Sequence, residues 1–217
     1  MPDPEPQALA GAVDALRRVL ANLRKTKAPA ALLADVAREL DALHARLAPY
    51  DHPGPYAQGI LDMGEGSFIP GARDPAVFFP YSPVVGPHNP IAPPVVFEQR
   101  GDELVAEHVF DAPYCGPPTA VHGGIVALVF DELLGCVNVV NDAGGFTGTL
   151  TVRYRSLTPV GERIAMRGWI ERREGRKTFA KGTMHCGDVL CAEAEGVFIA
   201  PSESPLERVR RALAEGA

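Results

Sequence analysis

The chain has 217 residues, a formal net charge of -6 and 46% hydrophobic residues, the profile of an ordinary soluble protein with one main domain and an appendage. Because the balance is acidic and no long cluster of lysine and arginine occurs, we expect no nucleic acid partner. The same acidity means that any phosphorylated ligand must be held by a local basic patch.

Neither a signal peptide nor a membrane-spanning segment is expected. Residues 1–6 are acidic and proline-rich, whereas a signal peptide begins basic and continues apolar. The longest unbroken apolar run, residues 125–130, is far too short to span a bilayer. We therefore predict a cytoplasmic protein without membrane insertion, whose four cysteines remain reduced.

Residues 1–48 are predicted to form an N-terminal helical extension. Residues 27–29 interrupt it with a proline where a second helix could begin. An antiparallel helical hairpin that braces the main domain or a partner subunit is the simplest interpretation. Apolar residues recur at helical spacing on both halves: Leu9, Val13, Leu16, Leu20 and Leu23, then Leu32, Val36, Leu40, Leu43 and Leu47.

Residues 49–94 are predicted to be an ordered connecting segment without regular structure. Eleven of the 21 prolines lie there, which excludes a regular helix or a central strand. The aromatic residues Phe68, Phe78, Phe79 and Tyr81 are too apolar for a disordered linker. Long ordered loops often cover sites, although simple surface packing remains equally open.

Residues 95–200 are predicted to form the main domain, and residues 201–217 a helical tail. The residue pattern gives two strands (95–99 and 103–111), an apolar helix (122–139) and four strands (147–157, 162–173, 177–186 and 189–200). The helix is apolar nearly all round, so it should be buried on most sides. We therefore expect an α+β fold in which one antiparallel sheet wraps round one long central helix. Two cysteines on the last hairpin, Cys186 and Cys191 with His185, are a less favoured metal site because no second ligand cluster accompanies them.

The turn at His122-Gly123-Gly124 is the first candidate for chemistry. Two glycines at a helix start leave backbone N–H groups unshielded, and the helix dipole adds partial positive charge there. Such a turn can polarise a carbonyl and hold an oxyanion, although two glycines can also simply tighten a turn. The second candidate is Asp131 inside the apolar helix, where an unpaired carboxylate would be costly. An aspartate satisfied by a neighbouring hydroxyl or cation, or exposed beside Glu132, is the structural alternative. The His-Gly-Gly turn nine residues upstream favours function.

The turn, Asp131 nine residues after the histidine, and the strand Thr147-Gly148-Thr149-Leu150-Thr151-Val152-Arg153-Tyr154 together resemble PaaI-type hotdog acyl-CoA thioesterases over roughly residues 88–200. The resemblance implies a hotdog fold and thioester hydrolysis with no metal and no cofactor. It implies that Gly123 presents its N–H to the thioester carbonyl, beside Gly124, and that His122 orients the turn or the carbonyl. It further implies that Asp131 is nucleophile or general base, with Thr147 near the attacking water.

One position departs from the family pattern. Several members carry an asparagine six residues before the histidine, where this chain has Gly116. Water activation is therefore less certain, and His88 or Asn89 could substitute. The departure keeps open a non-catalytic acyl-CoA or fatty-acyl binding protein on the same fold. A thioesterase acting on carrier-protein thioesters is a further alternative, whereas the Asp/Asn and His pair of a hydratase is absent.

Helix geometry predicts an oligomer independently of the family. Gly123 and Asp131 are eight residues apart, which corresponds to about 12 Å along a helix axis. An aspartate side chain cannot reach across that distance to one thioester. If both residues act, each site combines Asp131 of one subunit with Gly123 of another, in a homodimer or a dimer of dimers.

Two binding elements complete the expectations. Arg172, Arg173, Arg176 and Lys177 surround a turn between two late strands and are the best local candidates for coenzyme A phosphates, although a solvated hairpin end explains each one singly. Residues 68–81 are expected near the acyl end of the pocket or over its mouth. The sequence does not specify the acyl group.

Overall fold

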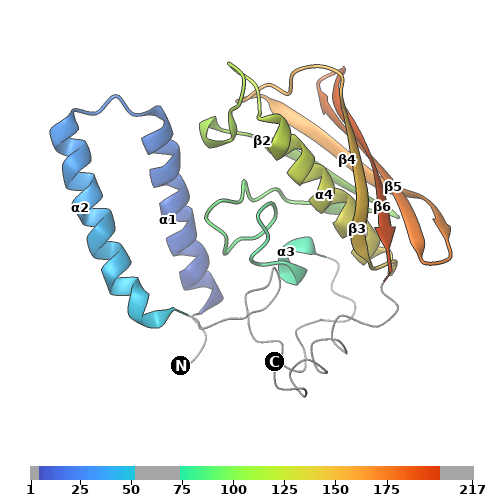
Figure 1. Ribbon diagram of the computed structural model, residues 1–217, viewed down its shortest axis with the longest axis horizontal. Coiled ribbons are helices and arrows are strands. Elements are labelled where there is room, and N and C mark those ends of the chain that lie inside the picture. Colours follow the sequence, from blue (N-terminus) through green and yellow to red (C-terminus); the bar gives the residue numbers. More distant parts are fainter. Residues whose placement is uncertain (1–4, 52–73, 201–217) are drawn as a thin grey trace.

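The computed structural model describes residues 5–51 and 74–200 (Figure 1). The predicted tail at 201–217, and residues 68–73 of the segment expected near the acyl pocket, lie outside the described residues. In order across Figure 1 come a helical hairpin, an irregular segment, one long helix and a six-stranded sheet.

The N-terminal hairpin consists of α1 (Pro6–Lys25) and α2 (Ala30–Leu47), followed by the short turn η1 (Ala48–Tyr50). The break falls at residues 26–29, and Pro29 is the extended residue before α2. Hydrogen bonds from the Arg17 guanidinium to the carbonyl oxygens of Gly86 (2.8 Å) and Asn89 (2.7 Å) hold α1 against the rest of the protein. No residue of α2 is buried, so α1 alone braces the main domain in the described chain.

Residues 74–97 form an ordered segment that begins with α3 (Pro75–Phe78) and passes between α1 and the long helix. Ser82 is fully buried there, and its hydroxyl accepts the N–H groups of Val84 (3.0 Å) and Val85 (3.2 Å). The same hydroxyl donates to Glu132 of the long helix at 2.5 Å. Side-chain hydrogen bonds therefore replace secondary structure where prolines prevent it.

The main domain is one antiparallel sheet with strand order β1-β2-β4-β5-β6-β3, packed on α4. The predicted α+β architecture, an antiparallel sheet around one long helix, is confirmed. The element bounds are β1 (Glu98–Arg100), β2 (Glu103–Val109), the turn η2 (Ala112–Tyr114), α4 (Gly123–Val140), β3 (Phe146–Tyr154), β4 (Arg163–Glu174), β5 (Lys177–Cys186) and β6 (Val189–Ile199).

Two predicted strands lose three residues at one end because their backbone forms hydrogen bonds outside the sheet. The strand predicted at 95–99 begins only at Glu98, since the Val95 N–H bonds to the Val84 oxygen in the irregular segment. The strand predicted at 147–157 ends at Tyr154, since the N–H groups of Arg155 and Ser156 both bond to the Cys191 oxygen. Hydrogen bonds to residues distant in the sequence therefore set the start of β1 and the end of β3.

Three glycines of the sheet let α4 approach closely. Gly168 of β4 faces Gly182 of β5, and Gly196 lies on β6 next to them. A Cβ atom on Gly168 would lie 2.9 Å from Leu133 Cγ of α4, and one on Gly182 would lie 3.2 Å from Leu134 Cδ2. Gly168, Gly182 and Gly196, here called the glycine track, thus form the surface against which the large apolar side chains of α4 pack.

The long helix is buried on fewer sides than the sequence predicted. By length and mean hydropathy α4 would qualify as a membrane span, but it is the core helix of this sheet. Its fully buried residues face the sheet: Val126, Val129, Phe130, Leu133, Leu134, Cys136, Val137 and Asn138. Another side, with Ala127, Leu128, Asp131 and Gly135, stays partly exposed in the single chain.

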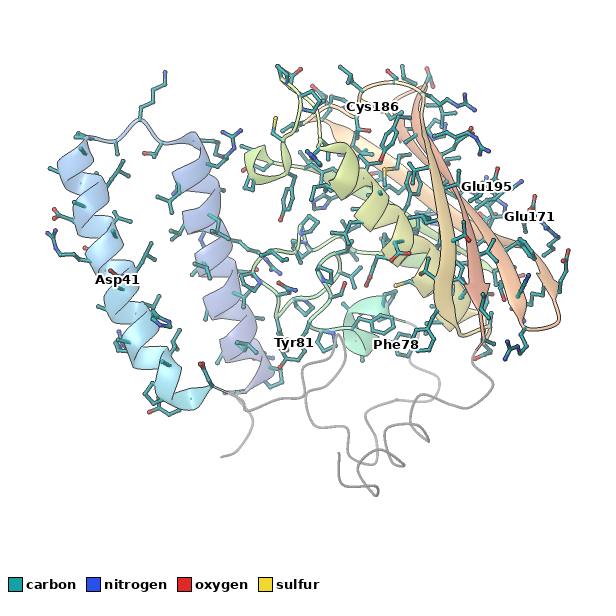
Figure 2. The ribbon with its side chains drawn as sticks, viewed as in Figure 1. Asp41, Phe78, Tyr81, Glu171, Cys186 and Glu195 are labelled. Carbon is teal, nitrogen blue, oxygen red and sulfur yellow. The ribbon has the colours of Figure 1, made fainter. Side chains whose placement is uncertain are left out.

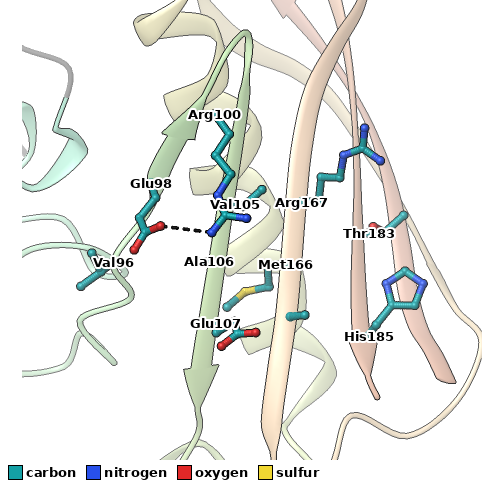
Figure 3. A pocket seen from close by; sticks show the side chains of 11 residues that line it. Val96, Glu98, Arg100, Val105, Ala106, Glu107, Met166, Arg167, Thr183 and His185 are labelled. Atoms are coloured by element: carbon teal, nitrogen blue, oxygen red, sulfur yellow. Dashed lines mark hydrogen bonds and ion pairs between the residues drawn. The ribbon is translucent and has the colours of Figure 1, made fainter. Parts of the chain in front are cut away.

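The outer face of the sheet is charged and open. Figure 2 shows Glu171 and Glu195 on the side of the sheet away from α4. Between the charged pairs lies a hollow of about 570 Å³ over Ala165 and Thr183, with the Glu98–Arg100 ion pair at one edge and His185 at the other (Figure 3). Ion pairs across the sheet and at the end of β3 cover the face: Arg163–Glu107, Arg167–Glu103, Arg153–Glu195, Arg155–Glu193 and Lys181–Glu171.

Candidate active site

The first turn of α4 leaves one backbone donor unused. His122 is the N-cap, and its Nδ1 accepts the Gly124 N–H at 2.9 Å. Its carbonyl oxygen accepts the N–H groups of Ile125 (2.9 Å) and Val126 (3.1 Å). Among the hydrogen bonds of the described residues, none uses the Gly123 N–H. The turn therefore offers Gly123 as a donor, in the positive end of the helix dipole.

Two contacts from outside the helix fix this turn. The Tyr154 hydroxyl donates to the Gly123 carbonyl oxygen at 2.7 Å, which ties the turn to the end of β3. The His122 N–H bonds to the Tyr114 oxygen at 2.8 Å, which ties it to η2. Because an accepting Nδ1 requires the proton of a neutral imidazole on Nε2, the cap also sets the tautomer of His122. A donor held on both sides is already oriented for an oxyanion.

The glycines near the turn serve different ends. A Cβ on Gly123 would lie 3.5 Å from the Tyr154 ring, an ordinary contact, so the fold tolerates a side chain there. A Cβ on Gly124 would lie 3.1 Å from His122 Nδ1, which is tight. A Cβ on Gly116 would lie 2.7 Å from His122 Cα and 2.9 Å from its Cβ. The fold thus requires glycine at position 116, a packing reason that the sequence comparison with the family asparagine missed.

Asp131 and Thr147 lie together at the middle of α4. The Thr147 hydroxyl donates to Asp131 Oδ1 at 2.8 Å, and Asp131 is partly exposed. Since the hydroxyl proton is directed at the carboxylate, the lone pairs of the Thr147 oxygen remain available to a water molecule. Gly123 lies eight residues away on the same helix, about 12 Å along its axis. The structure therefore contains two separate candidate half-sites, the turn and the Asp131–Thr147 pair.

The four basic residues at 172, 173, 176 and 177 are only partly available to a ligand. Arg172 pairs with Glu171 and Glu174, and its guanidinium lies 3.6 Å from the Phe179 ring centroid. Arg173 donates to the Asn141 oxygen at 2.7 Å. No hydrogen bond or ion pair of the described residues involves the side chains of Arg176 and Lys177. These two cations lie at the β4–β5 hairpin end, where Lys177 and Phe146 both pair with Ile199 and Thr147 follows directly.

The residues considered as substitutes for the family asparagine have structural partners. The Asn89 amide donates to the Tyr81 oxygen at 2.9 Å, and its side-chain oxygen accepts the Ile91 N–H at 3.1 Å. His88 packs edge-on against Tyr81, and burial lowers its pKa below the ordinary value. Both residues belong to the irregular segment that α1 holds, and their contacts there organise that segment.

Tyr154 and Tyr114 contact the turn from outside, and neither of them was assigned a role in the site from the sequence. The hydroxyl of one and the backbone oxygen of the other hold the turn, and neither role follows from local spacing. The alternation that places Leu150, Val152 and Tyr154 on one strand face was the available signal, because that face points toward α4. His185 and Cys186 end β5, and Cys191 lies on β6, as the hairpin interpretation predicted. Within residues 5–51 and 74–200 no group of three or more His, Cys, Asp or Glu could hold a metal ion.

The chain is similar in sequence to two curated acyl-CoA thioesterases. No family model matches the chain. It is 36% identical over 86 residues to acyl-coenzyme A thioesterase THEM4 of Xenopus laevis, a match that covers 39% of each protein. It is 30% identical over 86 residues to acyl-coenzyme A thioesterase THEM5 of Homo sapiens, over 39% of this chain and 35% of that protein. The chain thus matches less than two fifths of the length of these curated relatives.

A solved structure covers nearly the whole chain. The crystal structure of protein RHA08564, a thioesterase superfamily protein, is 32% identical in sequence and superposes with a TM-score of 0.77. The match spans 92% of this chain and 93% of that one, so it extends well beyond the helix and sheet. The chain belongs to the thioesterase superfamily and has its hotdog fold.

Proposed function

We propose that the protein is an acyl-CoA thioesterase, which hydrolyses an acyl-coenzyme A to a free acid and coenzyme A. The observation that carries the proposal is the unused Gly123 N–H, held by the bonds of His122 and Tyr154 at the start of α4. The names of the two curated relatives support the same substrate class.

In this mechanism the thioester oxygen accepts the Gly123 N–H, and the carbonyl carbon becomes more electrophilic. Asp131 either attacks that carbon itself or removes a proton from a water that attacks it. The tetrahedral oxyanion collapses, the C–S bond breaks, and the coenzyme A thiolate leaves and takes up a proton. If Asp131 attacked, water then hydrolyses the acyl-aspartate anhydride and regenerates the carboxylate. Thr147 keeps the carboxylate oriented in either route.

The sites are shared between subunits in this proposal. The 12 Å or so between Gly123 and Asp131 prevents one helix from supplying both groups to one thioester. Two features of the fold suit a second subunit: β3 pairs only with β6 in the described chain, and the side of α4 with Asp131 is partly exposed. An open sheet edge beside an uncovered apolar helix side favours association. We infer a homodimer or a dimer of dimers with composite sites.

The coenzyme A phosphates lie, in this proposal, against Arg176 and Lys177, with Arg172 and Arg173 behind them. Among the described residues these two cations have no side-chain partner, and they lie at the same end of the sheet as Thr147, so they would serve the subunit that supplies Asp131. A cytoplasmic location is proposed with this substrate.

Hydrolysis by Asp131 variants tests the reaction. Asp131→Asn keeps the shape of the side chain and removes its charge, so thiol release from a panel of acyl-CoAs should fall by orders of magnitude. Asp188→Asn, an exposed carboxylate in the β5–β6 turn, is the matched control and should keep full activity. Near-normal turnover of folded Asp131→Asn would remove the catalytic assignment.

Mixing two inactive variants tests the shared site. Asp131→Ala removes one half-site, and Gly123→Val crowds the other with a β-branched side chain next to Tyr154. A mixed dimer contains one site with both defects and one with neither, so about a quarter of normal activity should return in a random equimolar mixture. Heterodimers seen by mass spectrometry but without activity would exclude shared sites.

A non-catalytic acyl-CoA binding protein is the second candidate, favoured by one observation. The packing of Gly116 on His122 leaves no room for the family asparagine. Calorimetric binding of acyl-CoA with no thiol release by the wild-type protein would select this alternative.

A further inference from the structure

An apolar cavity of about 500 Å³ lies between α1, the segment of residues 83–93, η2 and the first two turns of α4. Leu20 forms its wall on α1, Ile91 its wall on the segment, and Ile125 and Leu128 its floor on α4. Four prolines complete the lining, so much of the wall has a restricted backbone. A preformed apolar cavity of this size is typical of sites for small organic ligands.

The cavity begins at the turn that presents Gly123. Tyr114 lines it, and the Tyr114 backbone oxygen accepts the His122 N–H at 2.8 Å. Ile125 lines it too, and its N–H bonds to the His122 oxygen at 2.9 Å. A group attached to a carbonyl at Gly123 therefore has an apolar space within one helical turn.

The charges around the cavity are compensated or directed outward. Arg17 also lines it, but its guanidinium pairs with Asp14 at 2.6 Å and bonds to the carbonyl oxygens of Gly86 and Asn89. Arg24 is exposed, so its charge lies at the mouth, as expected for a long cationic side chain over apolar surface. The interior suits an uncharged hydrocarbon rather than a polar acyl group.

We propose that this cavity receives the acyl chain of the substrate, a medium or long hydrocarbon, and that α1 is a specificity wall. The inference rests on the proposed thioesterase function. At about 30 Å³ for each water-sized group, the cavity has room for a chain of up to roughly 16 carbons. The N-terminal extension then belongs to the binding site, with Leu20 and Ile91 facing the chain from opposite sides.

Two tryptophan substitutions on α1 provide a matched test. Leu20 and Leu23 are both leucines of α1 with 39% and 38% exposure, but Leu20 lines this cavity and Leu23 faces α2. For Leu20→Trp we expect the ratio of kcat/KM for dodecanoyl-CoA over acetyl-CoA to fall at least tenfold. For Leu23→Trp the ratio should stay within twofold of the wild type. Ile91→Trp, which fills the cavity from the opposite wall, should reproduce the loss.

The possible outcomes distinguish a failure of the cavity assignment from a failure of the proposed thioesterase function. If wild type hydrolyses acyl-CoA but Leu20→Trp and Ile91→Trp keep its chain-length profile, the acyl chain lies elsewhere and the thioesterase proposal stands. An equal loss in Leu23→Trp would likewise overturn the cavity assignment. If wild type hydrolyses no acyl-CoA, the proposed function fails, and calorimetric titration with dodecanoate decides the cavity alone. Binding that weakens at least tenfold in Leu20→Trp and not in Leu23→Trp supports it, and equal binding by all three proteins refutes it.

Discussion

Replacing Gly116 tests whether packing or chemistry explains the glycine at this position. In Gly116→Ala the new Cβ would lie 2.7 Å from His122 Cα, and the two atoms must separate by about 0.7 Å to reach the 3.4 Å at which ordinary contacts begin. Overpacking of this kind costs about 1–3 kcal/mol. For a domain of this size, that cost lowers Tm by roughly 2–12 °C.

The displaced residue is the N-cap that holds Gly123, so the reaction should suffer as well. A misplacement approaching 1 Å costs up to about 100-fold in rate. Gly116→Asn has the same clash, so adding the family amide should not raise kcat. Gly11→Ala on α1, where a Cβ meets nothing within 4 Å, is the control. It should leave kcat unchanged and should not lower Tm, because alanine is the better helix former. A Gly116→Asn protein with wild-type Tm and a higher kcat would refute the packing explanation.

Three further predictions concern Tyr154, the pair Arg176 and Lys177, and His108. Tyr154→Phe removes one neutral hydrogen bond to Gly123, worth about 0.5–1.5 kcal/mol, so kcat/KM should drop about twofold to tenfold while circular dichroism is unchanged. In Arg176→Ala/Lys177→Ala the KM for acyl-CoA should rise on the order of fivefold, whereas the KM for an acyl-N-acetylcysteamine, which has no phosphate, should not move. Burial lowers the pKa of His108 below its ordinary 6.5, so below pH 6.5 the unfolded chain binds a proton that the folded one does not. Stability should therefore fall as the pH decreases through 6.5, with a smaller fall in His108→Phe; an identical pH dependence of Tm in the two proteins would contradict this.

Local periodicity predicted most of the fold. The helix at 122–139 and the strand at 177–186 differ from α4 and β5 by at most one residue at each end, because one side of each element packs into a continuous core. Where prediction failed, a distant backbone group had taken the hydrogen bond, as at Val95 and at Arg155. Such competition has no signature in a short stretch of sequence.

The candidate site was predictable only where its residues share one helix. His122, Gly123 and Asp131 could be related by helical geometry, including the 12 Å or so that separates the two half-sites. The family resemblance implied only that Thr147 lies near the attacking water. Neither the resemblance nor the sequence spacing predicted its hydrogen bond to Asp131. The Tyr154 hydroxyl and the contact between Gly116 and His122 are tertiary contacts, so they became visible only in the structure.

The glycine track of the sheet sets the height of the central helix above it. A methyl group at Gly168 would meet Leu133 at 2.9 Å, and the rigid helix would rise or tilt as one body. Such a movement would carry Gly123 and Asp131 with it, although neither touches the track. The sequence can therefore vary as little at Gly168, Gly182 and Gly196 as at a residue that meets the substrate. Inherited variants at these three positions should lose activity without any change in the reacting groups.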